Sequence, residues 1–335
     1  MMDKRELLAR ISLALILVVM PVGFFIYQYA LRPAISGVRV IDIRAVAPEA
    51  GGFQPDSMQV QAGETVTLRF HAEDVTHGIA IGPGLGIDLG EVDPGHMKEV
   101  TLTFDESGTY TFYCNTWCSP NHWRMRGVIE VRDVSNTIPA AQHDPVIDKL
   151  TAEGVDIDDT VHNGGQSNRS QEMDNIQPSA QRGASVIGQL VVPPELKDMD
   201  WRRSHSPQEA MALLLVDNSN ASTSDLVDAV AYLWTENTGS QALASASILY
   251  SKNCAACHGQ TGGADGPMAG QTAVKPIAFS DLAYMWLRRD NVLYAKIRRG
   301  GMGTDMPNFG TIFTPDETWA LVNYLRSLTL TPLDP

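Results

Sequence analysis

The chain has 335 residues, enough for about two or three domains. Hydrophobic residues make up 44% of it and charged residues 19%, which is ordinary for folded protein. The formal net charge of -14 at pH 7 argues against nucleic acid as a partner and suits a basic protein partner instead.

The first predicted element is a membrane-spanning helix from Ile11 to Leu31. No charged residue interrupts this segment, and about 20 apolar residues are needed to cross a bilayer. Lys4, Arg5 and Arg10 precede it, so the positive-inside rule places the N-terminus in the cytoplasm and the rest on the periplasmic side of the plasma membrane. The competing interpretation is a cleaved signal peptide, whose apolar region is normally about 7–15 residues.

The next stretch has the pattern of β-strands. Apolar residues alternate along 66–70 and again along 100–104, and glycines at 63 and 108 mark turns. Short strands at this spacing predict a β-sandwich. Residues 135–180 have no aromatic side chain and carry an excess of acidic residues. This composition indicates a linker.

Residues 181–240 have a helical pattern and contain a faint internal repeat. Trp201-Arg-Arg and the apolar run at 225–234 resemble Trp286-Leu-Arg-Arg and the run at 317–326. The first copy has no cysteine. It is either a degenerate copy of the C-terminal unit or a chance similarity between amphipathic helices.

Near the C-terminus, Cys254-Ala-Ala-Cys257-His258 has the spacing of a c-type haem attachment site. A thioredoxin-like motif would not require the histidine, and zinc would need two further ligands. Downstream, a glycine-rich segment offers Met306 before a proline, with Met302 as the fallback. A thioether is a suitable sixth ligand for an electron-transfer haem.

The segment 241–335 resembles the class I cytochromes c. The resemblance implies an all-α domain with covalent haem c, in which Cys254 and Cys257 hold the haem and His258 and Met306 bind its iron. On this basis the first helical copy would be a cytochrome c-like segment without haem.

A second cluster combines soft ligands in one loop. Cys114, Cys118, His122 and Met125 follow one another closely, and His77 lies after an earlier predicted strand. Thiolate and thioether sulfur select copper or zinc over hard cations. A Cys114–Cys118 disulfide and a zinc site are the alternatives, although neither explains the methionine.

This arrangement, from about Gly52 to Val131, resembles the CuA domain of cytochrome c oxidase subunit II and of nitrous oxide reductase. The resemblance implies a cupredoxin-like sandwich binding binuclear copper, in which Cys114 and Cys118 bridge the two ions. The remaining implied ligands are His77, His122, Met125 and the carbonyl of Thr116. Subunit II usually has glutamate at the position of Thr116, so we expect no magnesium site there.

The whole sequence therefore predicts a multidomain chain with one transmembrane helix, an all-β cupredoxin-like sandwich and an all-α cytochrome c domain. The predicted parts are a stub and anchor (1–35), the CuA domain (36–134), an acidic linker (135–180), the haem-free helical segment (181–240) and the cytochrome c domain (241–335).

The expected function is that of the electron-input subunit of a respiratory haem-copper oxidase. Electrons would come from a donor such as a soluble or membrane-bound cytochrome c, pass through haem c and CuA, and reach a catalytic membrane subunit that reduces oxygen. The alternatives are the equivalent subunit of a CuA-containing nitric oxide reductase and a free-standing membrane-anchored electron shuttle. No nucleophile–base constellation is visible, so we expect this chain to transfer electrons without a catalytic site of its own.

Overall fold

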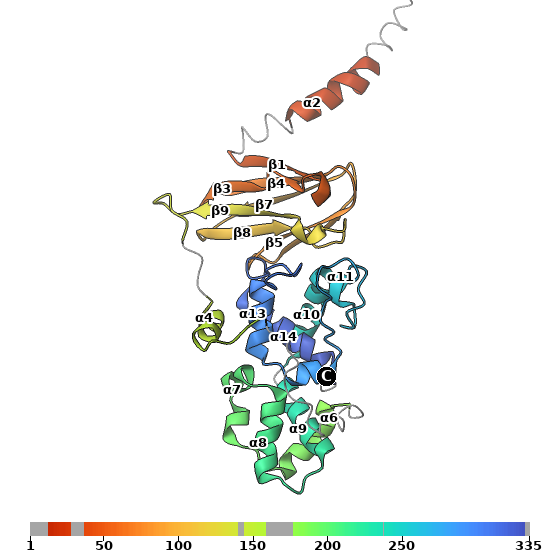
Figure 1. The fold of residues 1–335 in the computed structure, drawn as a ribbon. Helices are drawn as coiled ribbons and strands as arrows, with labels where there is room; N and C mark the ends of the chain where they lie inside the picture. Colours follow the sequence, from red (N-terminus) through yellow and green to blue (C-terminus); the bar gives the residue numbers. More distant parts are fainter. Residues whose placement is uncertain (1–12, 28–36, 140–143, 159–176, 237, 332–335) are drawn as a thin grey trace, which may run out of the picture.

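The computed structural model describes residues 13–27, 37–139, 144–158, 177–236 and 238–331. These parts are arranged roughly in a line (Figure 1): an N-terminal helix, a β-sandwich, a C-terminal helical unit and a further helical unit at the far end. The C-terminal unit lies between the sandwich and the further unit, although it comes last in the sequence.

Residues 13–27 are helical, as a π-helical turn η1 (Leu15–Val19) followed by α2 (Met20–Ile26). Their large apolar side chains are exposed. The rest of the predicted span from Ile11 to Leu31 falls outside the described residues. Among the helices that the structure describes, none has the length and apolar character needed to cross a membrane.

Two β-sheets pack face to face, as the alternating apolar pattern predicted. The first has the order β2-β1-β4-β7, and the second has the order β3-β9-β8-β5-β6. The pairs β1–β4 and β3–β9 are parallel and the other pairs are antiparallel. The strands are β1 (Arg39–Ala45), β2 (Phe53–Gln54), β3 (Ser57–Gln61), β4 (Thr65–Ala72), β5 (His77–Gly82), β6 (Ile87–Val92), β7 (Met97–Thr103), β8 (Gly108–Tyr113) and β9 (Arg126–Arg132).

The core between the sheets is apolar and close-packed. Phe112 lies 5.0 Å from Phe53 and 5.8 Å from Phe70, measured between ring centroids. Gly127 gives the Phe112 ring its space, since a Cβ there would lie 2.0 Å from the ring. Cys114 and Met125 belong to the same buried cluster, so the sandwich core itself holds two of the predicted copper ligands.

After the sandwich, the regular elements in the described part of the chain are helices. The C-terminal unit contains α10 (Ser240–Asn253), α11 (Ala255–His258), α12 (Leu282–Trp286), α13 (Asp290–Arg299) and α14 (Pro315–Ser327). The further unit contains α6 (Ala180–Val186), α7 (Met199–Ser204), α8 (Pro207–Asp217) and α9 (Thr223–Thr235). Short 3-10 turns are η3 (Pro48–Ala50), η4 (His122–Arg124), η5 (Ile187–Gln189) and η6 (Pro194–Lys197).

The last helix begins where the sequence indicates. Thr314 caps the amide of Glu317, and the Glu317 carboxylate accepts a hydrogen bond from the Thr314 amide, which forms a capping box with Pro315 at the first helical position. α14 then packs across α10. This crossing forms the main buried core of the C-terminal unit.

The further helical unit has a hydrophobic core of its own, in which α6 crosses α9. Gly183 makes that close crossing possible, since a Cβ there would lie 2.0 Å from the carbonyl oxygen of Asp228. Trp201 lies in α7 and Trp286 in α12, so each member of the sequence repeat falls in a short helix. Kinship between the two units stays a prediction.

Part of the predicted acidic linker is an ordered helix, α4 (Pro145–Ala152), which packs against α13 (Figure 1). Asp144 pairs with Arg298 at 2.5 Å and accepts a hydrogen bond from Tyr294 at 3.0 Å. Asp158 pairs with Lys296 at 2.9 Å and with Arg299. We call residues 144–158 the strap, because they are fixed to the C-terminal unit at both ends.

Candidate functional site: two metal-ligand clusters

The sandwich brings the predicted copper ligands together at one edge. β5, β8 and β9 are neighbours in the second sheet. His77 begins β5, Cys114 directly follows β8, and Met125 directly precedes β9. Because β8 runs antiparallel to both neighbours, all three positions fall at the same edge of the sheet. Residues 114–125 form the connecting loop, so their local spacing determines the rest of the cluster.

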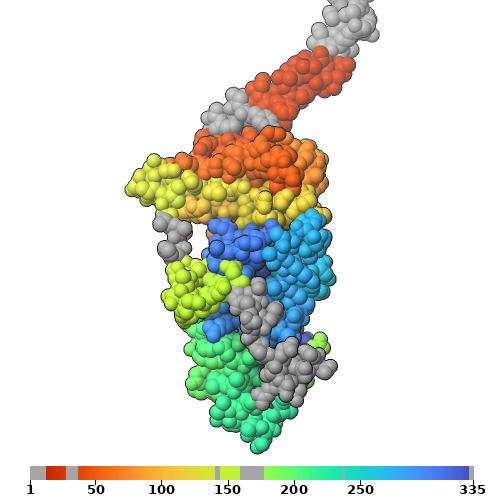
Figure 2. All heavy atoms as spheres, in the orientation of Figure 1, coloured from red at the N-terminus to blue at the C-terminus, as the bar shows by residue number. Residues whose placement is uncertain are grey.

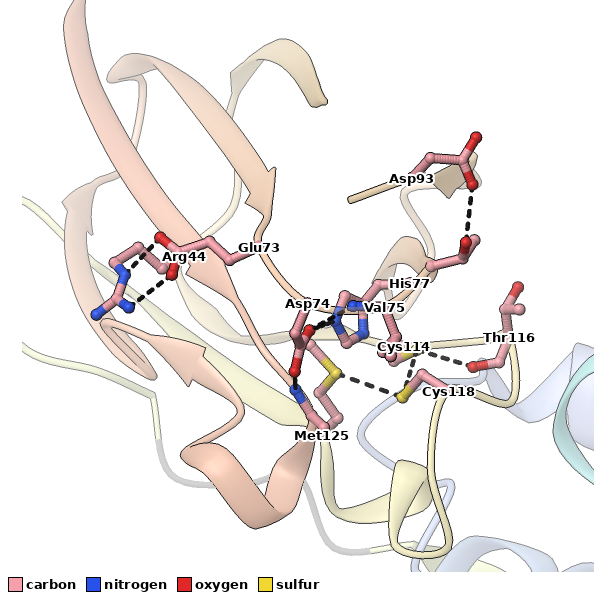
Figure 3. Close-up of polar contacts among 12 residues, drawn as sticks. Arg44, Glu73, Asp74, Val75, His77, Asp93, Cys114, Thr116, Cys118 and Met125 are labelled. Carbon is pink, nitrogen blue, oxygen red and sulfur yellow. Dashed lines mark hydrogen bonds and ion pairs between the residues drawn. The ribbon is translucent and has the colours of Figure 1, made fainter. Parts of the chain in front are cut away.

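The sulfur atoms of this loop lie close together (Figure 3). Cys114 Sγ lies 3.7 Å from Cys118 Sγ, which in turn lies 3.9 Å from Met125 Sδ. Cys114 Sγ also contacts the carbonyl oxygen of Thr116 at 3.0 Å. The two cysteines are free thiols, since a disulfide requires sulfur atoms about 2.05 Å apart.

Two buried imidazoles complete the cluster. The ligand atoms of His77, Cys114 and Cys118 all lie within 4.8 Å of one another. His122 is 6% exposed and interacts with the Cys114 thiol. The Nδ1 atoms of His77 and His122 are buried and have no hydrogen-bond partner among the described residues. Leaving a buried nitrogen without a hydrogen-bond partner destabilises the fold. Binding to metal would give both Nδ1 atoms a partner.

The cluster shifts the acidity of its own thiols. The Cys118 thiol, together with the His122 and His77 imidazoles, holds the pKa of Cys114 well below its usual range. Contact with Cys114 and burial raise the pKa of Cys118. The lowered pKa favours the thiolate form of Cys114, which is the form that binds a metal. The cluster offers two thiols and two imidazole nitrogens, together with the Met125 thioether and the Thr116 carbonyl. This donor set fits copper, which prefers soft ligands.

The C-terminal unit arranges the haem motif around the end of α10. Cys254 ends that helix, and α11 carries Cys257 and His258 in one turn. His258 Nδ1 bonds the carbonyl of Ile277 at 2.9 Å, and its ring stacks on Phe279 at 4.4 Å between centroids. Burial lowers the pKa of His258, which favours the neutral imidazole that an iron ion requires.

These contacts fit covalent haem. The bond to Ile277 holds the His258 proton on Nδ1 and leaves Nε2 as the ligand atom, the arrangement common to metal-bound histidines. Cys254 and Cys257 are free thiols, and each keeps partial exposure on the same turn as His258. Burial raises the pKa of both thiols, which is the opposite of the lowered pKa that activates a redox cysteine.

The two candidate sixth ligands differ sharply in environment. Met302 is 69% exposed, whereas Met306 packs against the buried core of the C-terminal unit. The Met306 carbonyl accepts a hydrogen bond from the Gly301 amide at 3.1 Å. Gly300 allows this tight loop because its φ is +81° and a Cβ would lie 2.8 Å from the Met306 carbonyl oxygen.

Two contributors were missed by the sequence reasoning. Asp74 lies behind His77 and accepts a hydrogen bond from its Nε2 at 3.0 Å (Figure 3). An acid three residues before a candidate ligand was the available signal. The carbonyl of Ile277 carries no such signal, because a backbone acceptor can belong to any residue.

Models of two known protein families match this chain, one over the sandwich and one over the C-terminal helical unit. A cupredoxin-like domain model matches residues 17–129, and a cytochrome c model matches residues 243–329. The chain joins a cupredoxin-like domain to a cytochrome c domain. The first of these is the sandwich that holds the cysteine, histidine and methionine cluster, and the second is the helical unit that holds the CxxCH turn.

Two curated relatives, both named cytochrome c oxidase subunit 2 and both from Thermus thermophilus, are 34% identical over 84 residues, or 25% of this chain. That match covers 61% of one relative and 49% of the other, so the chain spans about half to three fifths of their length. A cryo-EM structure of a heme-copper terminal oxidase dimer aligns with 37% of this chain and 97% of its own at 21% identity. Its TM-score of 0.25 is too low to support any functional conclusion.

Proposed function

We propose that this chain is the electron-input subunit of a respiratory haem-copper oxidase. The proposal rests above all on one observation: a buried cluster of two free thiols and two imidazoles shares a chain with a CxxCH cytochrome c domain. Similarity to oxidase subunit 2 supports the same conclusion for part of the chain.

The residues have distinct roles in this proposal. Cys114 and Cys118 would hold the copper pair with their thiolates, His77 and His122 would each supply one imidazole, and Met125 and the Thr116 carbonyl would be weaker ligands. Cys254 and Cys257 hold haem c, with His258 and Met306 on its iron. The two groups supply one-electron redox chemistry, and the protein supplies fixed ligand geometry and exclusion of water.

The wider assembly is also part of the proposal. The segment from Ile11 to Leu31 anchors the chain in the plasma membrane with both domains on the periplasmic side. Electrons arrive from a donor such as a cytochrome c and leave for a catalytic membrane subunit that reduces oxygen. Trp117, which is 49% exposed beside the copper ligands, is a candidate contact for one of these partners.

One observation favours a second candidate, the equivalent subunit of a nitric oxide reductase. Thr116 replaces the glutamate usual in oxidase subunit II, and its hydroxyl lies 3.4 Å from the carboxylate of Glu91. Purifying the native complex and measuring oxygen and nitric oxide consumption with reduced cytochrome c separates the two. Consumption of nitric oxide without oxygen uptake would refute the oxidase. A chain that purifies without a haem-bearing membrane subunit would instead support a free-standing shuttle.

A crossed pair of variants tests the two sites within the chain. Cys118→Ser should abolish the near-infrared absorbance of the copper pair and leave the haem spectrum unchanged. Cys257→Ala should disturb covalent haem attachment and leave the copper absorbance unchanged. Persistence of the copper signal in Cys118→Ser would refute the bridging role.

A further inference from the structure

The cytochrome c domain contacts the cupredoxin-like domain through both apolar packing and polar bonds. In Figure 2 the blue C-terminal residues lie directly against the yellow residues of the sandwich. Ala80 and Tyr113, from β5 and β8, are buried in the core cluster of the cytochrome c domain together with Ile312 and Phe313. The domains are therefore packed against each other and share part of one core.

The first polar contact joins residues next to two proposed metal ligands. Arg126 directly follows Met125, and its Nη1 donates to the carbonyl oxygen of Asn308 at 2.5 Å and to the Asn308 side chain at 3.1 Å. Asn308 lies two residues after Met306. The Arg126 guanidinium also lies 5.3 Å from the centroid of the Phe309 ring.

Arg126 is held in place from its own domain as well. Its Nε donates to the carbonyl of Trp123 at 3.1 Å, and its backbone pairs with Tyr113 between β9 and β8. The guanidinium of an arginine stays protonated in proteins, so this donor is charged. Hydrogen bonds from a charged donor are about twice as strong as neutral ones.

The second polar contact has the same character. Lys252, two residues before Cys254, forms an ion pair with Asp88 of β6. Asp88 also accepts a hydrogen bond at 3.1 Å from Asn115, the residue directly after Cys114. The first contact joins the residue beside Met125 to one near Met306. The second joins a residue near Cys254, through Asp88, to the residue beside Cys114.

The backbones themselves approach closely between these contacts. A Cβ on Gly82, the last residue of β5, would lie 2.3 Å from the carbonyl oxygen of Ile312. A backbone oxygen cannot swing aside as a flexible side chain can. The glycine therefore permits the observed fit between the domains.

We propose that Arg126 is a positioning residue that docks the cytochrome c domain onto the copper-ligand loop in one fixed orientation, assisted by the Lys252–Asp88 pair. This inference rests on the proposed function. Its consequence is that the electron passing from ferrous haem to the oxidised copper pair crosses a set distance. In that transfer the one electron given up by ferrous haem would be accepted by the oxidised copper pair, and no other reactant would be needed.

The test uses the full chain, loaded with haem and copper, and three pairs of substitutions. Arg126→Met and Lys252→Met remove one interdomain contact each. Arg124→Met is the matched control for the first, since Arg124 flanks Met125 on its other side and stacks on Trp123 of its own domain. Lys275→Met, at an exposed position, is the control for the second. Haem and copper spectra establish that both sites are intact in every variant.

The first readout is amide hydrogen exchange in residues 78–82 and 308–313, which does not depend on electron transfer. Loss of the charged hydrogen bonds should speed exchange at this surface about tenfold in Arg126→Met and less in Lys252→Met. The second readout is the rate of haem-to-copper electron transfer after photoreduction, which should fall in the same order. Both controls should match the unsubstituted protein.

A third pair of variants guards against a folding defect in Arg126→Met. Gly82→Ala should force the domains apart and reproduce both effects, whereas Gly108→Ala, with open space around its Cβ, should change neither. Unchanged exchange at 308–313 would refute the docking role, and unchanged transfer with faster exchange would refute the positioning role. No transfer in the unsubstituted protein, with exchange behaving as expected, would refute the proposed function instead.

Discussion

Asp74 Oδ1 accepts a hydrogen bond from Nε2 of the buried His77 at 3.0 Å, at the end of the sandwich that holds the cysteine cluster. Asp74 is itself fixed, because it also accepts from the amides of Ala47 and Val75 at 2.7 Å each. The contact holds the His77 proton on Nε2 and directs the unpartnered Nδ1 to the cluster. A carboxylate behind a metal-binding histidine also raises its basicity.

We therefore expect Asp74→Ala to weaken copper binding about 10–100-fold, the usual effect of removing a partner behind a ligand. A copper titration followed by the near-infrared absorbance measures this. The neighbouring Glu73→Ala is the control, since the Glu73 side chain pairs with Arg44 at the surface and exposed pairs contribute little (Figure 3). Equal affinity in both variants would show that Asp74 does not orient His77.

The contrast between Met302 and Met306 gives the second prediction. Met306→Ala should remove the proposed sixth haem ligand and lower the reduction potential, because thioether sulfur stabilises the reduced iron. Met302→Ala should leave the potential unchanged, since its side chain is 69% exposed. Redox titration with a record of the haem spectrum measures both. A shift confined to Met302→Ala would reverse the assignment.

The strap predicts a pH dependence. Burial alone would raise the pKa of Asp158, but bonds from Lys296, the Met302 amide and Arg299 outweigh it, and the pKa is lowered. A carboxyl group with a lowered pKa stabilises the folded contact above its ordinary pKa of about 3.9. That stabilisation is lost as the pH falls through the lowered value.

Asp158→Asn should therefore loosen the strap at neutral pH and remove part of this acid sensitivity. We expect amide exchange in residues 144–158 to rise about fivefold, in line with the modest strength of partly exposed ion pairs. Glu153→Gln, at an exposed position of the same segment, serves as control. Identical exchange in Asp158→Asn and the parent protein at pH 7 would contradict the prediction.

The crossing of α6 and α9 predicts a loss of stability. Gly183→Ala would place a methyl group 2.0 Å from the Asp228 carbonyl oxygen, so the helices must separate. Overpacking of this kind costs about 1–3 kcal/mol, more than the helix propensity gained from alanine. Thermal unfolding measures the loss, and Gly188→Ala, with open space around its Cβ, should show none. Equal melting temperatures would show that this crossing does not limit stability.

Much of the fold could be read from local pattern. Alternating apolar residues at 66–70 and 100–104 predicted strands that the structure places in β4 and β7, and the Thr314 capping box predicted the start of α14. The acidic composition of the linker gave no sign that residues 144–158 would bind the basic end of α13. That contact depends on complementary charges about 140 residues apart in the sequence.

The sequence by itself brought together most of the residues that we propose as ligands of the two metal groups. Close covalent spacing brings Cys114, Cys118, His122 and Met125, and separately the CxxCH turn, together whatever the rest of the chain does. Only the tertiary structure decided that Asp74 supports His77 and that Arg126 reaches Asn308. Pairing of strands and docking of domains depend on the packing of surfaces that are distant in sequence, and no local pattern records that packing.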